Sequence, residues 1–254
     1  LGGKCPTIIA QTANLKSAVG TITWGKFANA GQTCIAPDYI YVHESKLDQF
    51  VQLMKDKVGE YYGEKPEESA SYTRVVNEKH FHRVKEMLET SVSQGAKVIV
   101  GGDMDPGDNM IQPTVVVDPP MDSQLMQEEI FGPELPINTL KYLDEVVEYI
   151  RKGERPLALY VYTSNAKTAH KIMSETRAGT AAINNAAVHF FNNNLPFGGS
   201  NNSGIGKSHG HHGFLAFSNE KGIYQQHIPG ALTLLMPPYN DLKKKLIQLT
   251  LKYF

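Results

Sequence analysis

Apolar residues recur along this chain at two spacings that alternate with each other. Five segments have the helical spacing that leaves one apolar stripe. Their stripes are Leu15, Val19 and Ile22; Leu47, Phe50, Val51, Met54 and Val58; Phe81, Val84 and Leu88; Leu143, Val146, Val147 and Ile150; and Ala169, Ile172 and Met173. Short apolar runs typical of strands lie at 39–42, 98–100, 114–117, 157–162 and 181–183. This alternation predicts an α/β layered domain, with a largely parallel sheet and flanking helices.

Three polar residues indicate where helices begin. Ser45, with Asp48 three residues later, resembles a capping box ahead of the second stripe. Asn77 is placed to cap the helix of the third stripe, and the fifth stripe follows Ser164. Cys5 stands before Pro6 in a run that reads as a strand, so we expect it to be a structural residue.

A break at Pro229-Gly230 is the one boundary that the sequence suggests. We therefore expect a main domain over 1–228 and a tail over 229–254. In the tail, an apolar stripe runs beside basic residues and predicts an amphipathic helix. The stripe is Leu242, Leu246 and Leu249, and the basic residues are Lys243, Lys244 and Lys245. We expect this helix to dock on protein, such as a partner subunit, rather than on a membrane surface.

Composition excludes several functions. A hydrophobic content of 41% with 20% charged residues is ordinary for a soluble globular domain. A formal net charge of −1 gives no reason to expect nucleic acid as a partner. No apolar stretch reaches the roughly 20 residues of a membrane helix, so we expect no membrane anchor. Two cysteines cannot build a disulfide framework, and a reactive thiol needs a reducing compartment, which favours the cytoplasm.

Cys34 is the strongest candidate for chemistry. It ends the segment Phe27-Ala-Asn-Ala-Gly-Gln-Thr-Cys34, which breaks the first helical pattern. In the loop beyond this helix, backbone N–H groups are not used in helical hydrogen bonds, and nearby positive dipoles lower the pKa of a thiol. We therefore expect a reactive thiolate at Cys34, although a small buried cysteine is the ordinary alternative.

Four motifs resemble those of the aldehyde dehydrogenase superfamily and occur in that family's order. They are Leu1-Gly-Gly-Lys4, Gly31-Gln-Thr-Cys34, Glu128-Glu-Ile-Phe-Gly-Pro133 and Leu195-Pro-Phe-Gly-Gly199. Further segments resemble the class-3 branch, which acts on fatty and aromatic aldehydes. These are Trp24-Gly-Lys-Phe27, Ala36-Pro-Asp-Tyr39, Arg155-Pro-Leu-Ala-Leu-Tyr160, Ser208-His-Gly210 and Met236-Pro-Pro-Tyr239.

The resemblance implies NAD(P)-dependent oxidation of an aldehyde through a thiohemiacetal and a thioester on Cys34. It assigns Glu129 to the ribose hydroxyl groups of NAD or NADP, with a second possible role as a base, and Phe131 to the nicotinamide ring. On the substrate side it implies Asn184, His189 and Phe197. No metal is expected.

Leu1 falls in the middle of the first motif, directly after the position of the family's general-base glutamate. The family's Rossmann unit and its oxyanion-stabilising asparagine also belong upstream of that motif. We therefore expect this chain to be the C-terminal, catalytic half of a dehydrogenase that oxidises no aldehyde by itself. We expect homodimers to form through the other half and the tail.

Two other patterns could suggest a phosphate loop or a metal site, and the sequence argues against both. The stretch Gly198-Gly-Ser-Asn-Asn-Ser-Gly-Ile-Gly-Lys-Ser208 invites a phosphate-loop interpretation. However, Asn201 stands where such a loop needs glycine. The histidines could suggest metal, but neither cysteine lies at a ligand spacing from them. These histidines are His80, His82, His209, His211 and His212, and we expect them on surface loops.

Three other functional classes stay open. A thiol hydrolase would also use Cys34, with a histidine base and without nicotinamide. An acyl-transferring relative would pass the thioester to coenzyme A or phosphate, although the class-3 segments argue against it. A non-catalytic interaction module would tolerate the loss of Cys34. The identity of the aldehyde and the choice between NAD and NADP are not encoded in these motifs.

Overall fold

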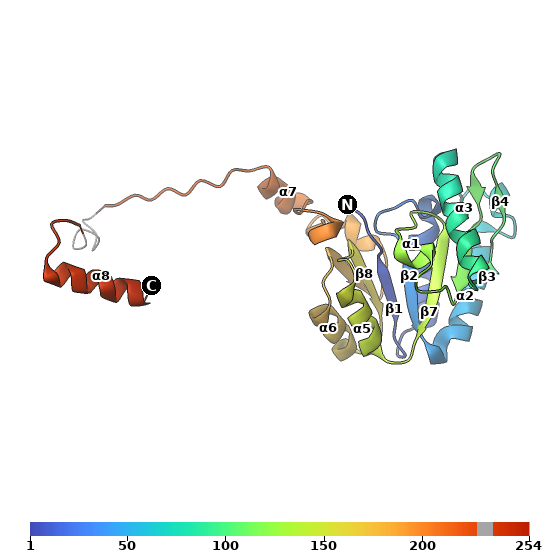
Figure 1. Cartoon of the computed structure of the whole chain (residues 1–254). Helices are drawn as coiled ribbons and strands as arrows, with labels where there is room; N and C mark the ends of the chain where they lie inside the picture. Colours follow the sequence, from blue (N-terminus) through green and yellow to red (C-terminus); the bar gives the residue numbers. More distant parts are fainter. Residues whose placement is uncertain (228–235, 254) are drawn as a thin grey trace. The chain divides into compact units, whose positions relative to one another are not determined.

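The computed structural model describes residues 1–227 and 236–253, in two units. The first unit, Leu1–Phe217, is the α/β domain, and Figure 1 shows its sheet between layers of helices. The second unit is Ser218–Phe254. The boundary expected at Pro229-Gly230 lies outside the described residues. Within the described chain, the division falls earlier, after Phe217.

A seven-stranded sheet forms the centre of the first unit, in the order β3-β6-β7-β2-β1-β8-β9. Its strands are β1 (Pro6–Ile9), β2 (Tyr39–His43), β3 (Lys97–Val100), β6 (Thr114–Val117), β7 (Glu134–Leu140), β8 (Ala158–Tyr162) and β9 (Thr180–Ile183). All neighbours are parallel except β3 and β6. The largely parallel sheet is therefore confirmed. The apolar runs had not indicated β7, because Glu134, Pro136 and Asn138 interrupt its pattern.

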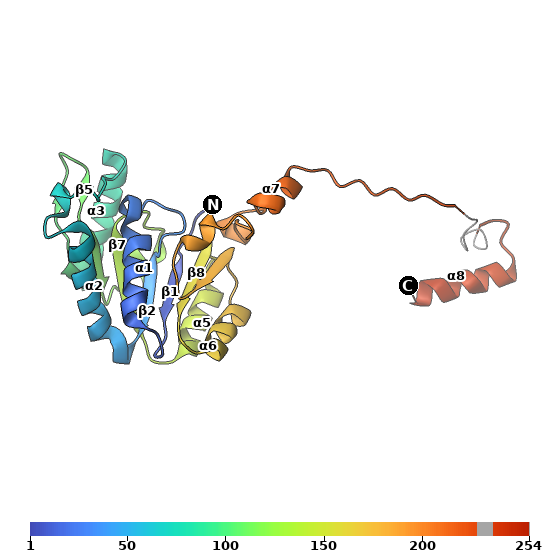
Figure 2. The same ribbon diagram turned by 180° about the vertical axis from the view of Figure 1, so that it is seen from behind.

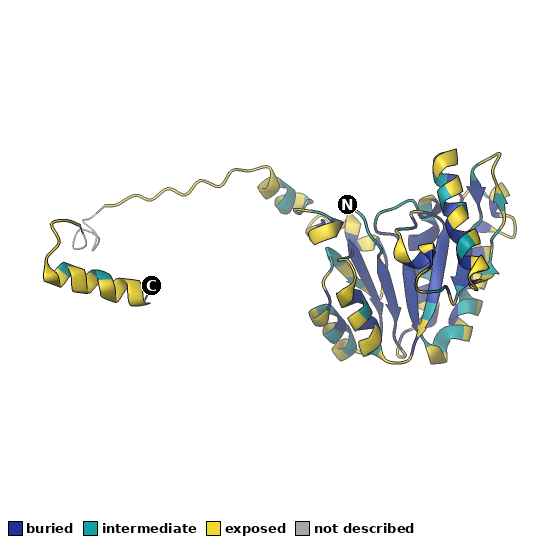
Figure 3. Cartoon of the chain, viewed as in Figure 1, coloured by how far each residue is buried: buried dark blue, intermediate teal, exposed yellow. Residues whose placement is uncertain are grey.

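Helices cover both faces of the sheet, as Figures 1 and 2 show from opposite sides. They are α1 (Leu15–Phe27), α2 (Leu47–Tyr62), α3 (Glu78–Ser93), α4 (Gln124–Gln127), α5 (Leu143–Lys152) and α6 (Ala166–Glu175). Helix α7 (Gly210–Ala216) lies away from the sheet in Figure 1 and buries none of its residues. Along β8, Tyr160 packs with α1 and α2, whereas Leu159 packs with α5 and α6. Because successive side chains point to opposite faces, a strand covered on both sides is buried throughout. Figure 3 shows the central strands, such as β1 and β8, as buried, whereas the edge strands β3 and β9 are partly exposed.

The helix starts agree with the sequence in one case and differ in two. Asn77 caps α3 by accepting a hydrogen bond from the His80 N–H. The capping box at Ser45 was wrong, because a 3₁₀ turn over Glu44–Lys46 precedes α2. The Ser45 hydroxyl instead pairs with Nδ1 of His43. Helix α6 begins at Ala166 and is capped by Asn165 rather than Ser164.

The remaining elements are a small hairpin and the predicted tail helix. Strands β4 (Met104–Asp105) and β5 (Met110–Ile111) form the hairpin. Helix α8 (Asp241–Tyr253) confirms that the amphipathic segment of the tail is a helix. The side chains of Leu242, Leu246 and Leu249 are exposed within their own unit. Among residues 1–227 and 236–253, no helix is long and apolar enough to cross a membrane.

Candidate active site

The loop that carries Cys34 leaves α1 through three consecutive residues in the left-handed region, namely Asn29, Ala30 and Gly31. Gly31 has a φ of 72°, and a Cβ on it would lie 2.1 Å from the carbonyl oxygen of Gly132. Only glycine satisfies both constraints. The Gly31–Cys34 motif and the Glu128–Pro133 motif are therefore packed backbone against backbone, although about 100 residues separate them in the sequence.

Two buried side chains hold the backbone around Cys34. The Cys5 thiol donates to the Cys34 carbonyl at 3.4 Å, and the Tyr160 hydroxyl donates to the Ile35 carbonyl at 2.6 Å. On the other side, Gln32 accepts from the Val76 N–H and donates to a carbonyl of the same segment. Cys5, directly before β1, is fully buried, as expected of a structural residue. The loop is thus tied to β1, β8 and the segment before α3.

Cys34 itself is partly exposed. Its surroundings disfavour ionisation of the thiol, whereas the sequence predicted that they would favour it. Burial raises the pKa of the Cys34 thiol, and the nearby Glu129 carboxylate raises it further. The N–H groups of Cys34 and Ile35 act in the opposite direction without overcoming burial. The prediction of a lowered pKa is therefore wrong for the chain in this structure, because desolvation outweighs the free N–H groups.

Glu129 and Phe131 lie between α4 and β7, at the same end of the sheet as Cys34. Burial raises the pKa of the Glu129 carboxyl, and a hydrogen bond from the Gly3 N–H partly offsets this. Phe131 leaves 39% of its surface exposed and has a φ of 44°, a strained value for a bulky residue. The loop therefore carries an ionisable acid and an uncovered ring two residues apart.

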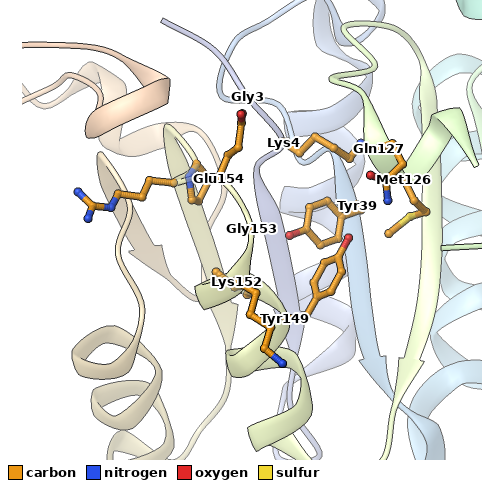
Figure 4. A pocket seen from close by; sticks show the side chains of 12 residues that line it. Gly3, Lys4, Tyr39, Met126, Gln127, Tyr149, Lys152, Gly153 and Glu154 are labelled. Atoms are coloured by element: carbon orange, nitrogen blue, oxygen red, sulfur yellow. The ribbon is translucent and has the colours of Figure 1, made fainter. Parts of the chain in front are cut away.

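A hollow of about 380 Å³ brings this acid together with other motifs. Its lining includes Gly2, Glu129, Arg155 and Ser203. A second cavity of about 380 Å³ adjoins it, and Lys4 lines both. Figure 4 shows this second cavity, with the Tyr39 and Tyr149 hydroxyl groups pointing inside it. Residues of the first motif therefore line both cavities.

The structure brings two of the three predicted substrate-side residues together. His189 and Phe197 are both buried, with ring centroids 6.4 Å apart. His189 also lies 5.9 Å from the ring of Tyr160, whose hydroxyl holds Ile35 next to Cys34. Burial lowers the pKa of His189, which favours its neutral form. Its Nε2 pairs with the Thr180 hydroxyl. The two residues thus reach the Cys34 loop through Tyr160.

Asn184 lies elsewhere. It follows the carboxyl end of β9, where its side chain bonds to both the N–H and the carbonyl of Thr163. Cys34 precedes the amino end of β2, which runs parallel to β9 in the same sheet. The structure therefore does not bring Asn184 to Cys34, and its side chain bridges the ends of β8 and β9. Its assignment to substrate stays a prediction.

The glycine-rich stretch after Phe197 does not have the arrangement of a phosphate loop. Lys207 donates to the carbonyl oxygens of Gly179, Gly198 and Gly199, so its ammonium group is used inside the loop. The nearby histidines pack on rings: His209 stacks on Phe197 and His211 on Phe214. Within residues 1–227 and 236–253, no group of three His, Cys, Asp or Glu side chains is placed to hold a metal ion.

Sequence reasoning missed four residues that support this site: Lys4, Asp38, Arg83 and Tyr160. Lys4, Asp38 and Tyr160 stand inside quoted motifs, but the motifs alone did not indicate their partners. Arg83 lies in α3 beside the apolar stripe of Phe81 and Val84. A charged residue at the margin of a stripe is common on solvated helices, so this signal alone would not have indicated a role.

A buried cation lies beneath the two loops. Lys26 is fully buried at the end of α1, 3.9 Å from a carboxylate oxygen of Asp38, and its ammonium group makes no hydrogen bond within the described residues. Burial lowers the pKa of Lys26 to about 8, although Asp38 opposes the shift. Glu134 is also fully buried, and burial raises the pKa of its carboxyl.

We expect Lys26→Met to remove a pH dependence of stability. Unfolded Lys26 keeps its proton up to its usual pKa of 10.5, whereas folded Lys26 loses it near 8. Between these values the unfolded state binds more protons, so the free energy of unfolding rises with pH. Urea unfolding of this chain at pH 7 to 9.5 measures the slope. Lys16→Met, an exposed change on the same helix, should keep the wild-type slope. Equal slopes in all three proteins would contradict the burial argument.

The fold and the loops together define a class of protein. A parallel α/β sheet presents a partly exposed cysteine, an adjacent carboxylate and an uncovered aromatic ring at the amino ends of its strands, an arrangement suited to a thiol-dependent enzyme. The family model described as "Aldehyde dehydrogenase family" matches residues 1–223. The chain belongs to the aldehyde dehydrogenase family.

Individual relatives agree with this assignment. The chain is 42% identical over 228 residues to "Putative aldehyde dehydrogenase AldX" of Bacillus subtilis, covering 89% of this chain and 51% of that protein. It is 42% identical over 245 residues to "Aldehyde dehydrogenase family 3 member A2" of Rattus norvegicus, covering 96% and 50%. The class-3-like resemblance is confirmed. The chain spans about half the length of these curated relatives.

Solved structures confirm the fold. "Substrate bound state of Staphylococcus Aureus AldH" superposes with a TM-score of 0.88 at 38% identity, covering 99% of this chain and 54% of that one. "Crystal structure of Mycobacterium tuberculosis aldehyde dehydrogenase complexed with NAD+" has a TM-score of 0.77 at 31% identity, covering 87% and 46%.

Proposed function

We propose that this chain supplies the catalytic cysteine and the nicotinamide-side contacts of an NAD(P)-dependent aldehyde dehydrogenase. We use "complete enzyme" for this chain together with the half of the family's length that it does not span. One observation carries the proposal: the Cys34 loop and the Glu129 loop pack on each other at Gly31 and Gly132. A nucleophile that holds the aldehyde and an acid that binds the cofactor must meet in one site if hydride is to pass from one to the other.

Cys34 is the nucleophile in this proposal. Its thiolate attacks the carbonyl carbon of the aldehyde, forming a carbon–sulfur bond and a thiohemiacetal. The Cys34 N–H, which faces the thiol, is positioned to donate to the developing oxyanion. Loss of hydride from the thiohemiacetal carbon leaves a thioester on Cys34, and water then releases the carboxylic acid. The family resemblance assigns activation of this water to a glutamate ahead of Leu1, with Glu129 as a second base.

Glu129 and Phe131 fit a nicotinamide nucleoside. A carboxylate accepts hydrogen bonds from two ribose hydroxyl groups, and the uncovered Phe131 ring offers an apolar face to a planar ring. When bound, the cofactor supplies the acceptor for hydride. The hollow lined by Gly2 and Glu129 gives the carboxylate its access to a ligand. Family structures such as the Mycobacterium tuberculosis complex hold NAD+. The choice between NAD and NADP is left open.

We propose His189 and Phe197 as part of the substrate wall, since both reach the Cys34 loop through Tyr160. The assignment of Asn184 to this wall is weaker, because its side chain is bonded to Thr163. Two further proposals rest on the reactive thiol and on the exposed apolar stripe of helix α8. One is a cytoplasmic location, where thiols stay reduced. The other is homodimerisation through the family's other half and the tail.

The proposed activity is tested by NADH formation at 340 nm. The complete enzyme is mixed with a fatty or aromatic aldehyde and NAD or NADP, with and without coenzyme A. We expect acid formation that needs nicotinamide and not coenzyme A. We also expect this 254-residue chain alone to form no NADH. Ester hydrolysis without nicotinamide dependence would identify a thiol hydrolase instead, and thioester transfer to coenzyme A would identify an acyl-transferring enzyme.

Glu129→Gln should weaken the use of the cofactor. The amide keeps the shape but loses the charge that strengthens hydrogen bonds to ribose hydroxyl groups, a contribution of roughly 1.5–3 kcal/mol. We expect kcat/KM for NAD(P) to fall about 10- to 100-fold. Glu128→Gln, an exposed neighbour in the same motif, serves as the control. Unchanged cofactor kinetics in Glu129→Gln would contradict its assignment.

A further inference from the structure

The backbone of the Glu129 loop is held by charged side chains that come from three different parts of the fold. Lys4, ahead of β1, donates to the carbonyl oxygens of Leu125 at 2.8 Å and Glu128 at 2.7 Å. The same ammonium group pairs with Asp38 at 2.5 Å. Asp38, ahead of β2, accepts the Ile130 N–H through its other oxygen at 3.1 Å. Lys4 and Asp38 therefore fix the loop on one side.

Arg83 of α3 fixes the loop on the other side. Its guanidinium group donates to the Glu129 carbonyl at 3.2 Å and to the Ile130 carbonyl at 2.5 Å. The planar fork of an arginine suits two neighbouring acceptors, whereas a lysine is a single point donor. Every backbone carbonyl from Glu128 to Ile130 is thus bonded to a cation. The Glu129 carboxylate takes no part in these bonds; in this structure it accepts a hydrogen bond from the Gly3 N–H.

This loop needs holding because its geometry is unfavourable. Phe131 follows directly, with a φ of 44° that a bulky residue rarely adopts. A residue in such a region persists only when its surroundings determine it. Gly132 adds a second constraint, since a Cβ there would lie 2.8 Å from Val84 of α3. Helix α3 therefore contacts the loop at two points, through Arg83 and Val84.

We propose that Arg83, with Lys4 and Asp38, forms a clamp that positions Glu129 and Phe131 for the cofactor, and that Arg83 is its positioning residue on α3. The inference rests on the proposed function of Glu129. The clamp acts through the backbone, so Arg83 touches neither the substrate nor the proposed ribose contact. Its loss is expected to loosen the loop without changing the nucleophile, because the Cys34 loop has its own anchors in Cys5, Tyr160 and Gln32.

The clamp is tested first without any cofactor. Hydrogen–deuterium exchange of the 128–133 segment is measured in this chain, in Arg83→Met and in Lys85→Met. Lys85 lies two residues further along α3 and forms an ion pair with Glu89 at 3.7 Å, so its loss removes the same charge from the same helix. We expect faster exchange at 128–133 in Arg83→Met alone. Arg83→Lys keeps the charge and is less disruptive, so its exchange rate at 128–133 should lie between those of Arg83→Met and the unchanged chain. An intermediate rate distinguishes loss of the clamp from misfolding of Arg83→Met.

The cofactor role is tested second, in the complete enzyme, by fluorescence titration with NADH. We expect the Kd to rise about tenfold in Arg83→Met, the equivalent of about 1.4 kcal/mol, with Lys85→Met unchanged. The rate of Cys34 alkylation and KM for aldehyde should stay the same, which a general structural defect would not allow. Unchanged exchange in both Arg83 variants overturns the clamp. Faster exchange with unchanged Kd overturns the cofactor role assigned to the loop while the clamp itself stands.

Discussion

Replacing Cys34 with serine in the complete enzyme is expected to lower kcat for aldehyde oxidation by about 10⁴-fold or more, as loss of a covalent nucleophile does in other enzymes. The serine hydroxyl is a far weaker nucleophile than a thiolate at neutral pH. It is also partly buried in an environment that disfavours ionisation, because burial already raises the pKa of the thiol it replaces. Binding of NADH should be retained, since Cys34 contributes no proposed contact to the ribose.

Cys5→Ser is the matched control for this experiment. A serine hydroxyl at position 5 can still donate to the Cys34 carbonyl, which the Cys5 thiol does at 3.4 Å. We therefore expect Cys5→Ser to keep most of the activity. Steady-state kinetics with NAD(P) and aldehyde measure both variants. Comparable kcat values for Cys34→Ser and the unchanged enzyme would rule out the covalent mechanism.

The second large effect is a difference in alkylation between the two cysteines of this chain. Cys34 is partly exposed, whereas Cys5 is fully buried. The Cys5 thiol donates a hydrogen bond to the Cys34 carbonyl and accepts one from the Ala158 N–H. Burial raises the pKa of both thiols, and it does so more for Cys5. Cys5 can react only after the core opens around β1. An opening that costs about 4 kcal/mol slows labelling about 1,000-fold.

Timed labelling with iodoacetamide, followed by peptide mapping, measures both sites in one sample. We expect Cys34 to be modified at least about 1,000-fold faster than Cys5 in the folded chain. In 6 M guanidinium chloride the two rates should converge, which controls for intrinsic differences between the peptides. Similar rates in the folded chain would show that Cys34 is no more accessible than the core cysteine, and its role as nucleophile would be abandoned.

The stripes and runs of apolar residues were sufficient for the architecture. They predicted the positions of α1, α2, α3, α5 and α6, because one buried face leaves a local mark in the sequence. They failed at β7, whose Glu134 and Pro136 interrupt the pattern. They also failed at the start of α2, where His43 and not Asp48 is the partner of Ser45. At β7, pairing with β2 and β6 overrides the interrupted pattern, whereas at α2 one local contact of Ser45 replaces another.

The site was predictable as a set of motifs but not as a geometry. Cys34, Glu129 and Phe131 could be named from their motifs, and the structure places their loops together. The electrostatics of Cys34 could not be predicted, because the burial that raises its pKa comes from elements distant in the sequence. The position of Asn184 differed for a similar reason. Its neighbours in the chain say nothing about Thr163, which directly follows the adjacent strand β8.

By itself, the sequence determined the fold class and the family and singled out Cys34 as the proposed nucleophile, because periodicity and short motifs are local properties. The tertiary structure alone decided which loops meet, since Gly31 contacts Gly132 only after β2 and β7 pair in the sheet. It also decided that Lys4, Asp38 and Arg83 act on one loop. Their partners are backbone groups, which carry no residue-specific signal, and so the clamp becomes visible only when three distant segments fold together.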